Sequence, residues 1–538
     1  MALYKSRVDR GSSAAYAVSV EKAFRNQSER DLRMPGPAKV ACITLDAAEQ
    51  SLLRGWASQG LLPHFGRVLK ECVSSATRNP EIIYSGTLWP SFNTGLWPGR
   101  HDNYFYLQPN SGSYGLRPFN PEHLSVDSIW NAIEQAGHRI ALIDVPKALL
   151  NLTSRTLQVS FWGEHEVRHP LSCWPPSFEQ QVLQVAGKDP VGMCDLVRQN
   201  PQELRRLKDG LIERARKRAD LALAVLERGP WDLFVANFSE AHCAGHHLWA
   251  ARDPKHPQHQ TAFRVLLGED PLLDVYQAID RSLGRIVDAL GGDTFLLVLA
   301  THGMGPRYDA SAVLDSVLRR LDGMDVSTTF KPMETMRKMW MQFPGVIRRP
   351  FRRVADMIYD APRQQERARR RFYTIPTTDN CGGIRLNLRG RELRGQVDPG
   401  APYERLCEWL EGELLSLRNA VTGAPVVTRV LRGDLVFPGP FRNEFPDLIV
   451  EWNQQAPIPA VCSSRIGELR VESPNPRTGD HRPKGLVLAR STDLVPRMLE
   501  GEVAIVDIAP TLAARLGVSL LGIDGKPIHD FLPQHILV

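Results

Sequence analysis

Short apolar runs alternate with amphipathic segments along most of the chain. Continuous apolar runs predict buried strands, and the six runs are Lys39–Leu45, Arg139–Val145, Trp231–Phe238, Phe295–Ala300, Asp447–Glu451 and Leu486–Ala489. Apolar residues at helical spacing predict helices, and these segments are Leu52–Cys72, Leu204–Leu226, Leu273–Leu290 and Val503–Leu516. Buried strands that alternate with amphipathic helices predict an α/β fold with a mainly parallel sheet.

Polar clusters follow three of the predicted strands directly. They are Asp46, the segment Ser239–His247 and the segment Thr301–Met304. Ligands of open α/β sheets bind beyond the carboxyl ends of the strands. We therefore expect the functional site to lie where these three clusters meet.

Length and charge narrow the class of protein. A chain of 538 residues suggests one large α/β domain with insertions, or two domains. Its 66 basic and 60 acidic residues nearly balance, at a net charge of +6, which argues against a polycationic nucleic-acid-binding protein. The eight cysteines are scattered without a CxxC pair, as is typical of cytosolic proteins.

The N-terminal segment carries no targeting or membrane signal. Residues 1–37 are polar and predict a poorly ordered extension, with Met34 as an alternative start to Met1. The segment has no apolar core of a secretory signal, and no run of 18 apolar residues predicts a transmembrane helix. We expect a cytoplasmic protein.

A basic stretch in residues 325–372 differs in composition from its surroundings. Arginine and lysine crowd residues 337–371, in a background rich in methionine and phenylalanine. This composition predicts an inserted helical region. Two interpretations stay open, namely a solvated helix face, or a lid or interaction surface for an anion or partner.

Four histidines carry the candidate metal chemistry. His242 and His246 are four residues apart after a predicted strand, so on a helix they would share one face and reach one ion. His302 ends a strand before two glycines, and His481 is predicted in a polar turn before a strand. With Asp46, whose alternative role is a helix cap, these residues predict a histidine-rich metal centre.

A hydroxyl near a predicted helix start offers a nucleophile. Ser85 precedes a helix that is expected to begin near Gly86 or Thr87. Backbone N–H groups and the helix dipole at such a place favour a phosphate and an alkoxide, and a nearby metal would activate the hydroxyl. Thr87 is the alternative nucleophile, and a simple N-cap is the alternative role.

These segments, in this order, resemble the alkaline phosphatase superfamily, and most nearly its type I phosphodiesterase/nucleotide pyrophosphatase branch. In that layout the nucleophile opens a helix ten residues before the glycine of a TG pair, and here Ser85 stands ten residues before Gly95. The resemblance implies a three-layer sandwich with a mainly parallel central sheet and an inserted cap. It suggests a core over 38–325 and 441–538, with the cap region over 326–440.

The resemblance also implies roles for the site residues. It places Asp46, His242, His246, His302 and His481 at metal-binding positions, with Ser85 as nucleophile. Two of the family's aspartates are replaced here, one by His242 and the other by Thr301. One metal site then becomes His242, His246 and His481, and the other keeps Asp46, His302 and a weak Thr301.

The loss of two carboxylates affects which metal the centre would bind and how many ions. Neutral imidazoles suit zinc, with manganese as the alternative, and fewer carboxylates weaken the second site for hard ions. Whether the site binds one or two ions therefore remains open. Three histidines with an open coordination position are also the ligands of a mononuclear catalytic zinc. Glu240 and Asp480 are nearby carboxylates that would compensate if they point into the site.

The expected function is metal-dependent hydrolysis of a phosphodiester or phosphomonoester in a small-molecule substrate. Alternatives are a sulfatase, phosphotransferase or mutase on the same fold, or a degenerate member that binds metal or phosphate without catalysis. Tyr84, Trp89, Lys147 and the basic segment 337–371 are candidate pocket elements, each with a structural alternative. The sequence indicates neither the substrate nor the oligomeric state.

Overall fold

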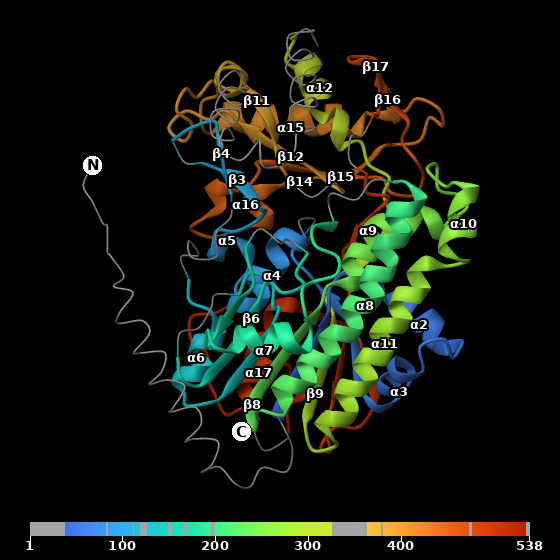
Figure 1. Cartoon of the computed structure of the whole chain (residues 1–538). Helices are drawn as coiled ribbons and strands as arrows, with labels where there is room; N and C mark the ends of the chain where they lie inside the picture. The colour runs from blue at the N-terminus through green and yellow to red at the C-terminus, as the bar shows by residue number, and fades with distance from the viewer. Residues whose placement is uncertain are drawn as a thin grey trace.

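A nine-stranded sheet lies at the centre of the computed structural model of this chain (Figure 1). The described residues are 38–81, 84–110, 112–118, 126–148, 153–165, 169–194, 199–324, 363–377, 380–472 and 476–533. From edge to edge the strands are β20 (Arg497–Ala504), β2 (Val73–Arg78), β19 (Leu486–Arg490), β9 (Phe295–Ala300), β1 (Ala38–Leu45), β8 (Trp231–Phe238), β5 (Ile140–Ile143), β6 (Thr156–Ser160) and β7 (Ser172–Trp174).

Most neighbouring strands of this sheet run parallel. Strand β1 is parallel to β8 and β9, β5 is parallel to β6 and β8, and β2 is parallel to β20. Strand β19 is antiparallel to β2 and β9, and β7 is antiparallel to β6. The expected mainly parallel sheet is confirmed, and the carboxyl ends of β1, β8 and β9 meet at one edge.

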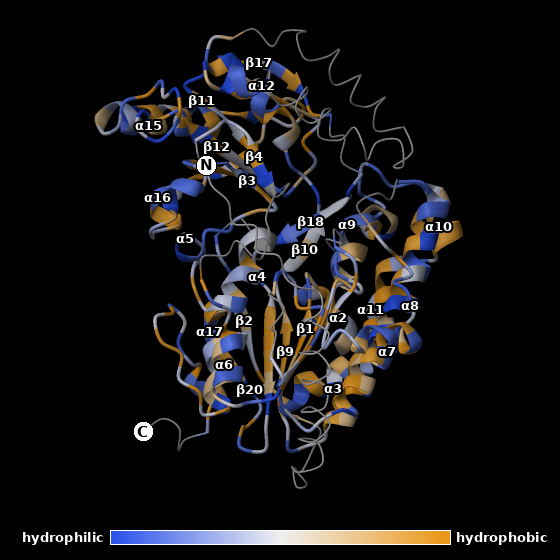
Figure 2. Ribbon diagram, turned by 60° about the vertical axis from the view of Figure 1, so that its left-hand side comes forward, coloured by the Kyte–Doolittle hydropathy of each residue, from blue (hydrophilic) through white to orange (hydrophobic). Residues whose placement is uncertain are grey.

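Helices cover both faces of the sheet. One layer holds α2 (Gln50–Ser58), α3 (Pro63–Glu71), α8 (Pro201–Leu226), α9 (Glu240–Arg252) and α11 (Pro271–Leu290), and the other holds α4 (Tyr84–Thr94), α6 (Ile129–Gln135) and α17 (Ile505–Arg515). Ile43 of β1 packs in the first core and Cys42 in the second, because successive strand side chains point to opposite faces. Figure 2 shows the central strands as the apolar middle of this three-layer sandwich.

A smaller sheet with its own apolar core forms a cap above the main sheet (Figure 1). Its strands, in order, are β11 (Phe372–Ile375), β12 (Cys381–Leu386), β15 (Leu448–Trp452) and β14 (Val427–Arg432), and helices α12 (Ser311–Leu321) and α15 (Ala401–Leu415) pack against it. The predicted strand Asp447–Glu451 thus exists as β15, but in this smaller sheet. The boundaries 326–440 and 441–538 stay predictions.

Short elements complete the described structure. They are α5 (Pro98–His101), β3 (Leu107–Pro109), β4 (Leu116–Pro118), α7 (Phe178–Val185), α10 (Thr261–Leu267), β10 (Gly303–Pro306), β13 (Arg418–Asn419), α16 (Gly433–Val436), β16 (Ala460–Ser463), β17 (Gly467–Arg470) and β18 (Gly479–Arg482). Strands β10 and β18 pair with each other between the main sheet and the cap (Figure 2). None of the described helices has the length and apolar character to span a bilayer.

Two local predictions differ from the structure. The segment Leu52–Cys72 forms two helices, α2 and α3, because the chain turns at Gly60, where φ is +76°, and restarts at Pro63, which favours the first turn of a helix. His481 lies in strand β18 and pairs with Met304 of β10, whereas the sequence predicted a turn. The extension 1–37 and the basic residues before 363 lie outside the described residues.

Candidate metal centre

Asp46 stands at the carboxyl end of the central strand β1 and uses both carboxylate oxygens within the protein. Its Oδ2 lies 2.9 Å from Nδ1 of His242, and its Oδ1 accepts the Thr301 hydroxyl at 3.2 Å. Burial would raise the pKa of this carboxyl, but the neighbouring histidines, His242 first, outweigh it and lower the pKa to about 2. Asp46 is therefore a buried anion in contact with His242 and Thr301.

His242 and His246 lie on helix α9, as the HxxxH spacing predicts. Their ring centroids are 4.7 Å apart. Nδ1 of His246 lies 2.9 Å from the carbonyl oxygen of Gly479, which only accepts, so this nitrogen donates. The lone pair then sits on Nε2, which is buried and has no hydrogen-bond partner within the described part of the chain. Such an imidazole has the tautomer that a metal ligand needs.

His481 brings a second ring nitrogen to His242. The two Nε2 atoms lie 2.9 Å apart, and the ring centroids of His481 and His246 lie 4.8 Å apart. Because Nδ1 of His242 faces the carboxylate of Asp46, it carries the proton, and its Nε2 lone pair faces His481. The structure therefore brings together the three histidines that the resemblance grouped as one site.

His302 and Thr301 close the other side of the centre. The Thr301 hydroxyl donates to Asp46 and accepts from the backbone N–H of Ala47 at 3.1 Å, while Nδ1 of His302 lies 3.0 Å from the same oxygen. These contacts saturate the hydroxyl. Nε2 of His302 is buried and lacks a hydrogen-bond partner among the described residues, and burial lowers the pKa of this imidazole to about 4. His302 therefore offers a neutral lone pair.

The two candidate compensating carboxylates behave differently. Oε1 of Glu240 lies 3.1 Å from Nε of both Arg214 and Arg218. The negative charge of Glu240 is therefore balanced by these two arginines of helix α8. Asp480 lies at the centre, where its carboxylate and the ring nitrogens of His246 and His481 have atoms within 4.8 Å of one another. Of these two carboxylates, Asp480 is therefore the one that the structure places beside the histidines.

A further histidine, His165, belongs to this cluster and was missed by the sequence analysis. Its ring centroid lies 4.1 Å from that of His242, and ring nitrogens of His165, His242 and His246 lie within 4.8 Å of one another. His165 follows β6, whose carboxyl end lies at the same edge of the sheet. The segment GEHEVRH carries the same HxxxH spacing, between His165 and His169, and recognition of β6 as the strand before it would have indicated His165.

The candidate nucleophile lies at the start of helix α4. The helix begins at Tyr84, so Ser85 is in its first turn, and the helix packs against β18, the strand of His481. The backbone approaches closely here, because a Cβ on Gly86 would lie 1.7 Å from the carbonyl oxygen of Tyr104. Lys147 donates from Nζ to the carbonyl oxygen of Gly86 at 3.2 Å, which places a cation beside the first turn.

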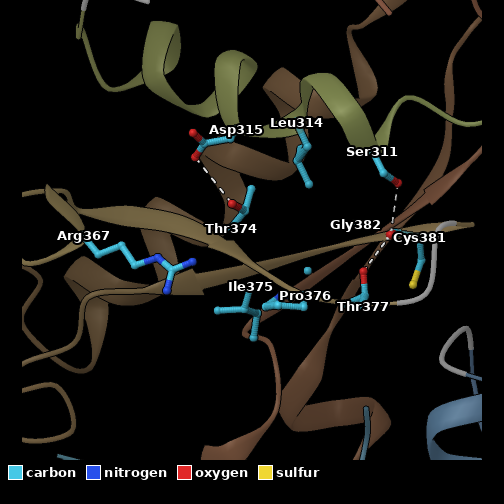
Figure 3. A pocket seen from close by; sticks show the side chains of 11 residues that line it. Ser311, Leu314, Asp315, Arg367, Thr374, Ile375, Pro376, Thr377, Cys381 and Gly382 are labelled. Carbon is cyan, nitrogen blue, oxygen red and sulfur yellow. Dashed lines mark hydrogen bonds between the residues drawn. The ribbon is translucent and has the colours of Figure 1, made fainter. Parts of the chain in front are cut away.

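Trp89 and the described part of the basic segment make structural contacts. Trp89 is buried in an apolar core, where it packs edge-to-face on Phe92. In the described part of the basic segment, Arg370 pairs with Asp315 at 2.7 Å, within the cap. A cavity of about 270 Å³ opens beside Asp315, between α12, β11 and β12 (Figure 3). It belongs to the cap, and its lining includes none of the histidines.

Comparisons with known proteins agree with this architecture. Two solved structures of phosphonoacetate hydrolase from Sinorhizobium meliloti 1021, in complex with phosphonoacetate and with phosphonoformate, are similar at a TM-score of 0.53 and 12% identity, covering 90% of this chain and 96% of theirs. Murine ectonucleotide pyrophosphatase/phosphodiesterase 5 gives a TM-score of 0.49 and 12% identity, over 91% of this chain and 97% of that one. At such identities the likeness to phosphonoacetate hydrolase shows the fold alone.

A comparison with curated proteins finds no match. The family comparison, by contrast, covers most of the chain, including Ser85 and every site residue up to His302. Because residues 40–458 match its pattern, the chain belongs to the type I phosphodiesterase/nucleotide pyrophosphatase family.

Proposed function

We propose that this chain is a metal-dependent hydrolase of phosphodiester or phosphomonoester bonds in small molecules, with Ser85 as nucleophile. The observation that carries the proposal is the meeting of buried histidines at the carboxyl edge of the sheet, where His246 and His302 each present an Nε2 lone pair without a partner among the described residues. Family membership supports the reaction class.

The donor set suits a divalent transition metal. Neutral imidazoles are zinc ligands of choice, and manganese is the alternative. We propose His242, His246 and His481 as ligands of one ion, with His302 beside it. The engagement of Asp46 by His242 and Thr301 favours one ion over two, because a second ion would have to share oxygens that each already accept a hydrogen bond. A bound ion would supply positive charge to the phosphoryl oxygens and lower the pKa of a coordinated hydroxyl or water.

The first turn of α4 and Lys147 have separate roles in the proposed reaction. Oγ of Ser85 attacks the phosphorus, the ester oxygen leaves, and water later hydrolyses the phosphoseryl bond. The N–H groups at the start of α4 and the ammonium of Lys147 favour the negative phosphoryl group there. Thr87, whose side chain is buried, remains the alternative nucleophile.

The test compares two serines of the same helix. The purified chain, loaded with Zn²⁺ or Mn²⁺, is assayed with bis(p-nitrophenyl) phosphate and p-nitrophenyl phosphate. Ser85→Ala should lose turnover by several orders of magnitude while it retains the metal. Ser91→Ala, almost two turns further along α4, should keep turnover. Full activity of Ser85→Ala together with an inactive Thr87→Val would transfer the role to Thr87.

A non-catalytic role is the second candidate, because the usual aspartates are His242 and Thr301 here and Asp46 is engaged by both. In that case the wild-type chain would bind zinc yet release no p-nitrophenol from either ester. A p-nitrophenyl sulfate arm tests the sulfatase alternative, and turnover of that ester alone would replace the phosphoesterase proposal.

A further inference from the structure

His165 lies between the histidine centre and a pair of buried cysteines. Its Nδ1 is 3.1 Å from Sγ of Cys194 and 3.5 Å from Sγ of Cys243. Both cysteines are fully buried, and their sulfurs and a ring nitrogen of His165 lie within 4.8 Å of one another. Both sulfurs therefore face one edge of the imidazole.

The opposite edge of the ring fixes its tautomer. Nη2 of Arg477 lies 3.3 Å from Nε2 of His165. A guanidinium has only donors, so Nε2 accepts, and in a neutral imidazole the single proton must then be on Nδ1. Nδ1–H points at the sulfurs, which accept. Contacts on both edges thus agree on a ring with its lone pair on Nε2.

The sulfur acceptors are themselves held in place. Nη2 of Arg214 donates to Sγ of Cys243 at 3.3 Å, and Nε of Arg214 donates to Glu240 at 3.1 Å. Arg214 and Glu240 are both fully buried. A chain of contacts therefore runs from helix α8 through Cys243 to the imidazole of His165, and it restricts rotation of the ring.

With Nδ1 engaged by the two sulfurs, the Nε2 edge of His165 is the one left for the histidine centre. Ring nitrogens of His165, His242 and His246 converge within 4.8 Å of one another. The guanidinium of Arg477, which contacts this edge, also lies close enough to contribute to the lowered pKa of His246 and His481, after burial. Nε2 is therefore the nitrogen of His165 that an ion shared by His242 and His246 would use.

We propose that His165 is an additional ligand of the ion at this centre, through Nε2, and that Cys194 and Cys243 are positioning residues that hold its Nδ1–H. The inference rests on the proposed metal dependence of the site. Metal-ligating histidines usually donate their other N–H to a fixed acceptor, and here two sulfurs take that place. Coordination requires Arg477 to leave Nε2, which frees its guanidinium beside the ion.

Zinc affinity of the full-length chain tests the proposal. Metal-free protein is titrated with Zn²⁺ in competition with a chromogenic chelator, for the wild type, His165→Ala and Cys194→Ala. Cys194→Ala should weaken zinc binding by about 10–100-fold, as loss of such an orienting partner does, and His165→Ala should weaken it further. Matched controls are His169→Ala, an exposed histidine of the same segment, and Cys173→Ala, a buried cysteine on β7. Both should bind as the wild type does.

Two further readouts keep the outcome interpretable. The Tm of each variant in excess chelator reports folding without metal, and the rise in Tm on adding zinc should be smaller in His165→Ala than in the wild type. With Co²⁺, the wild type should show histidine-type d–d bands without a thiolate-to-cobalt charge-transfer band. Such a band, if lost in Cys194→Ala, would make the cysteines ligands and overturn the positioning role.

The two proposals fail separately. Wild-type zinc affinity in His165→Ala would overturn this inference, whatever the activity. Weakened zinc binding in His165→Ala, in a wild-type chain that cleaves no phosphate ester, would support the inference and contradict the proposed reaction. Absence of zinc binding by the wild-type chain itself would also overturn the inference.

Discussion

Nδ1 of His242 lies 2.9 Å from Oδ2 of Asp46. His242 stands where the family pattern has a second aspartate. This contact changes the role of Asp46. An acceptor fixed on one ring nitrogen leaves the other for a metal, in the manner of carboxylate–histidine–zinc arrangements. We infer that Asp46 orients a ligand in this chain, and that the substitution at His242 exchanges a direct carboxylate ligand for an oriented imidazole.

Asp46→Asn tests this orienting role. The amide is nearly isosteric but lacks the charge that holds Nδ1–H of His242, so zinc affinity should fall by about 10–100-fold. If Asp46 were instead a direct and essential ligand, the substitution would abolish zinc binding. Competition titration with a chelator distinguishes these results. Asp144→Asn is not a suitable control, because Asp144 pairs with buried Arg218 at 2.6 Å, whereas exposed Asp209→Asn should leave affinity unchanged.

Thr301→Val removes the hydroxyl that links Asp46 to His302. Isosteric loss of this group leaves a buried N–H of Ala47, a carboxylate oxygen and Nδ1 of His302 without their common partner. The free energy of unfolding should fall by about 1–3 kcal/mol, as measured by urea denaturation. Thr428→Val, on the exposed face of β14, should change it by less than about 0.5 kcal/mol. Equal effects of the two substitutions would contradict the described network.

Glu240→Gln tests the anchoring of helix α9. Glu240 accepts from both Arg214 and Arg218, and all three side chains are buried. Loss of its charge leaves two buried guanidinium groups undercompensated, and breaking a buried pair in this way costs about 3–5 kcal/mol. We expect a correspondingly lower denaturation midpoint, whereas Glu213→Gln at the exposed side of α8 should have little effect. A midpoint equal to that of the wild type would show that the anchor is dispensable.

The buried histidines should make the metal-free chain acid-sensitive. Burial lowers the pKa of His302 to about 4, and it also lowers the pKa of His246 and His481 well below the ordinary value of an imidazole. An unfolded histidine has a pKa of about 6.5. Below that pH the unfolded chain therefore binds protons that the buried imidazoles of the folded chain do not bind. Stability is therefore highest above about pH 6.5 and falls toward pH 4, with a limiting slope of about 1.4 kcal/mol per pH unit for each such group.

Urea denaturation in chelator at about pH 7 and about pH 5 measures this dependence. His302→Gln should make the profile shallower, since it removes one of the titrating groups. A metal-free wild-type chain with equal stability at both values would contradict the neutral, buried state of these imidazoles.

The sequence predicted the parts of the fold whose burial leaves a simple pattern. Strands β1, β8 and β9 are continuous apolar runs because helices cover both faces, and the HxxxH spacing on α9 places His242 and His246 on one side. Edge strand β20 was missed, because its sequence RMLEGEVA is mostly exposed and has no continuous apolar run.

Two features of the site depend on tertiary contacts that no local pattern records. His481 sits in a four-residue strand, GDHR, whose strand character comes from pairing with β10. The environment of His165 is set by Cys194, Cys243 and Arg477, all distant in the sequence. Such residues become visible only when the sheet edge brings their segments together.

Metal analysis of the purified chain tests the central claim, a histidine-rich metal centre, most directly. We predict about one equivalent of zinc per chain after loading and removal of excess metal, and its loss in His246→Ala but not in exposed His169→Ala. Less than about 0.2 equivalents of any transition metal in the loaded wild type, or unchanged zinc in His246→Ala, would contradict the account.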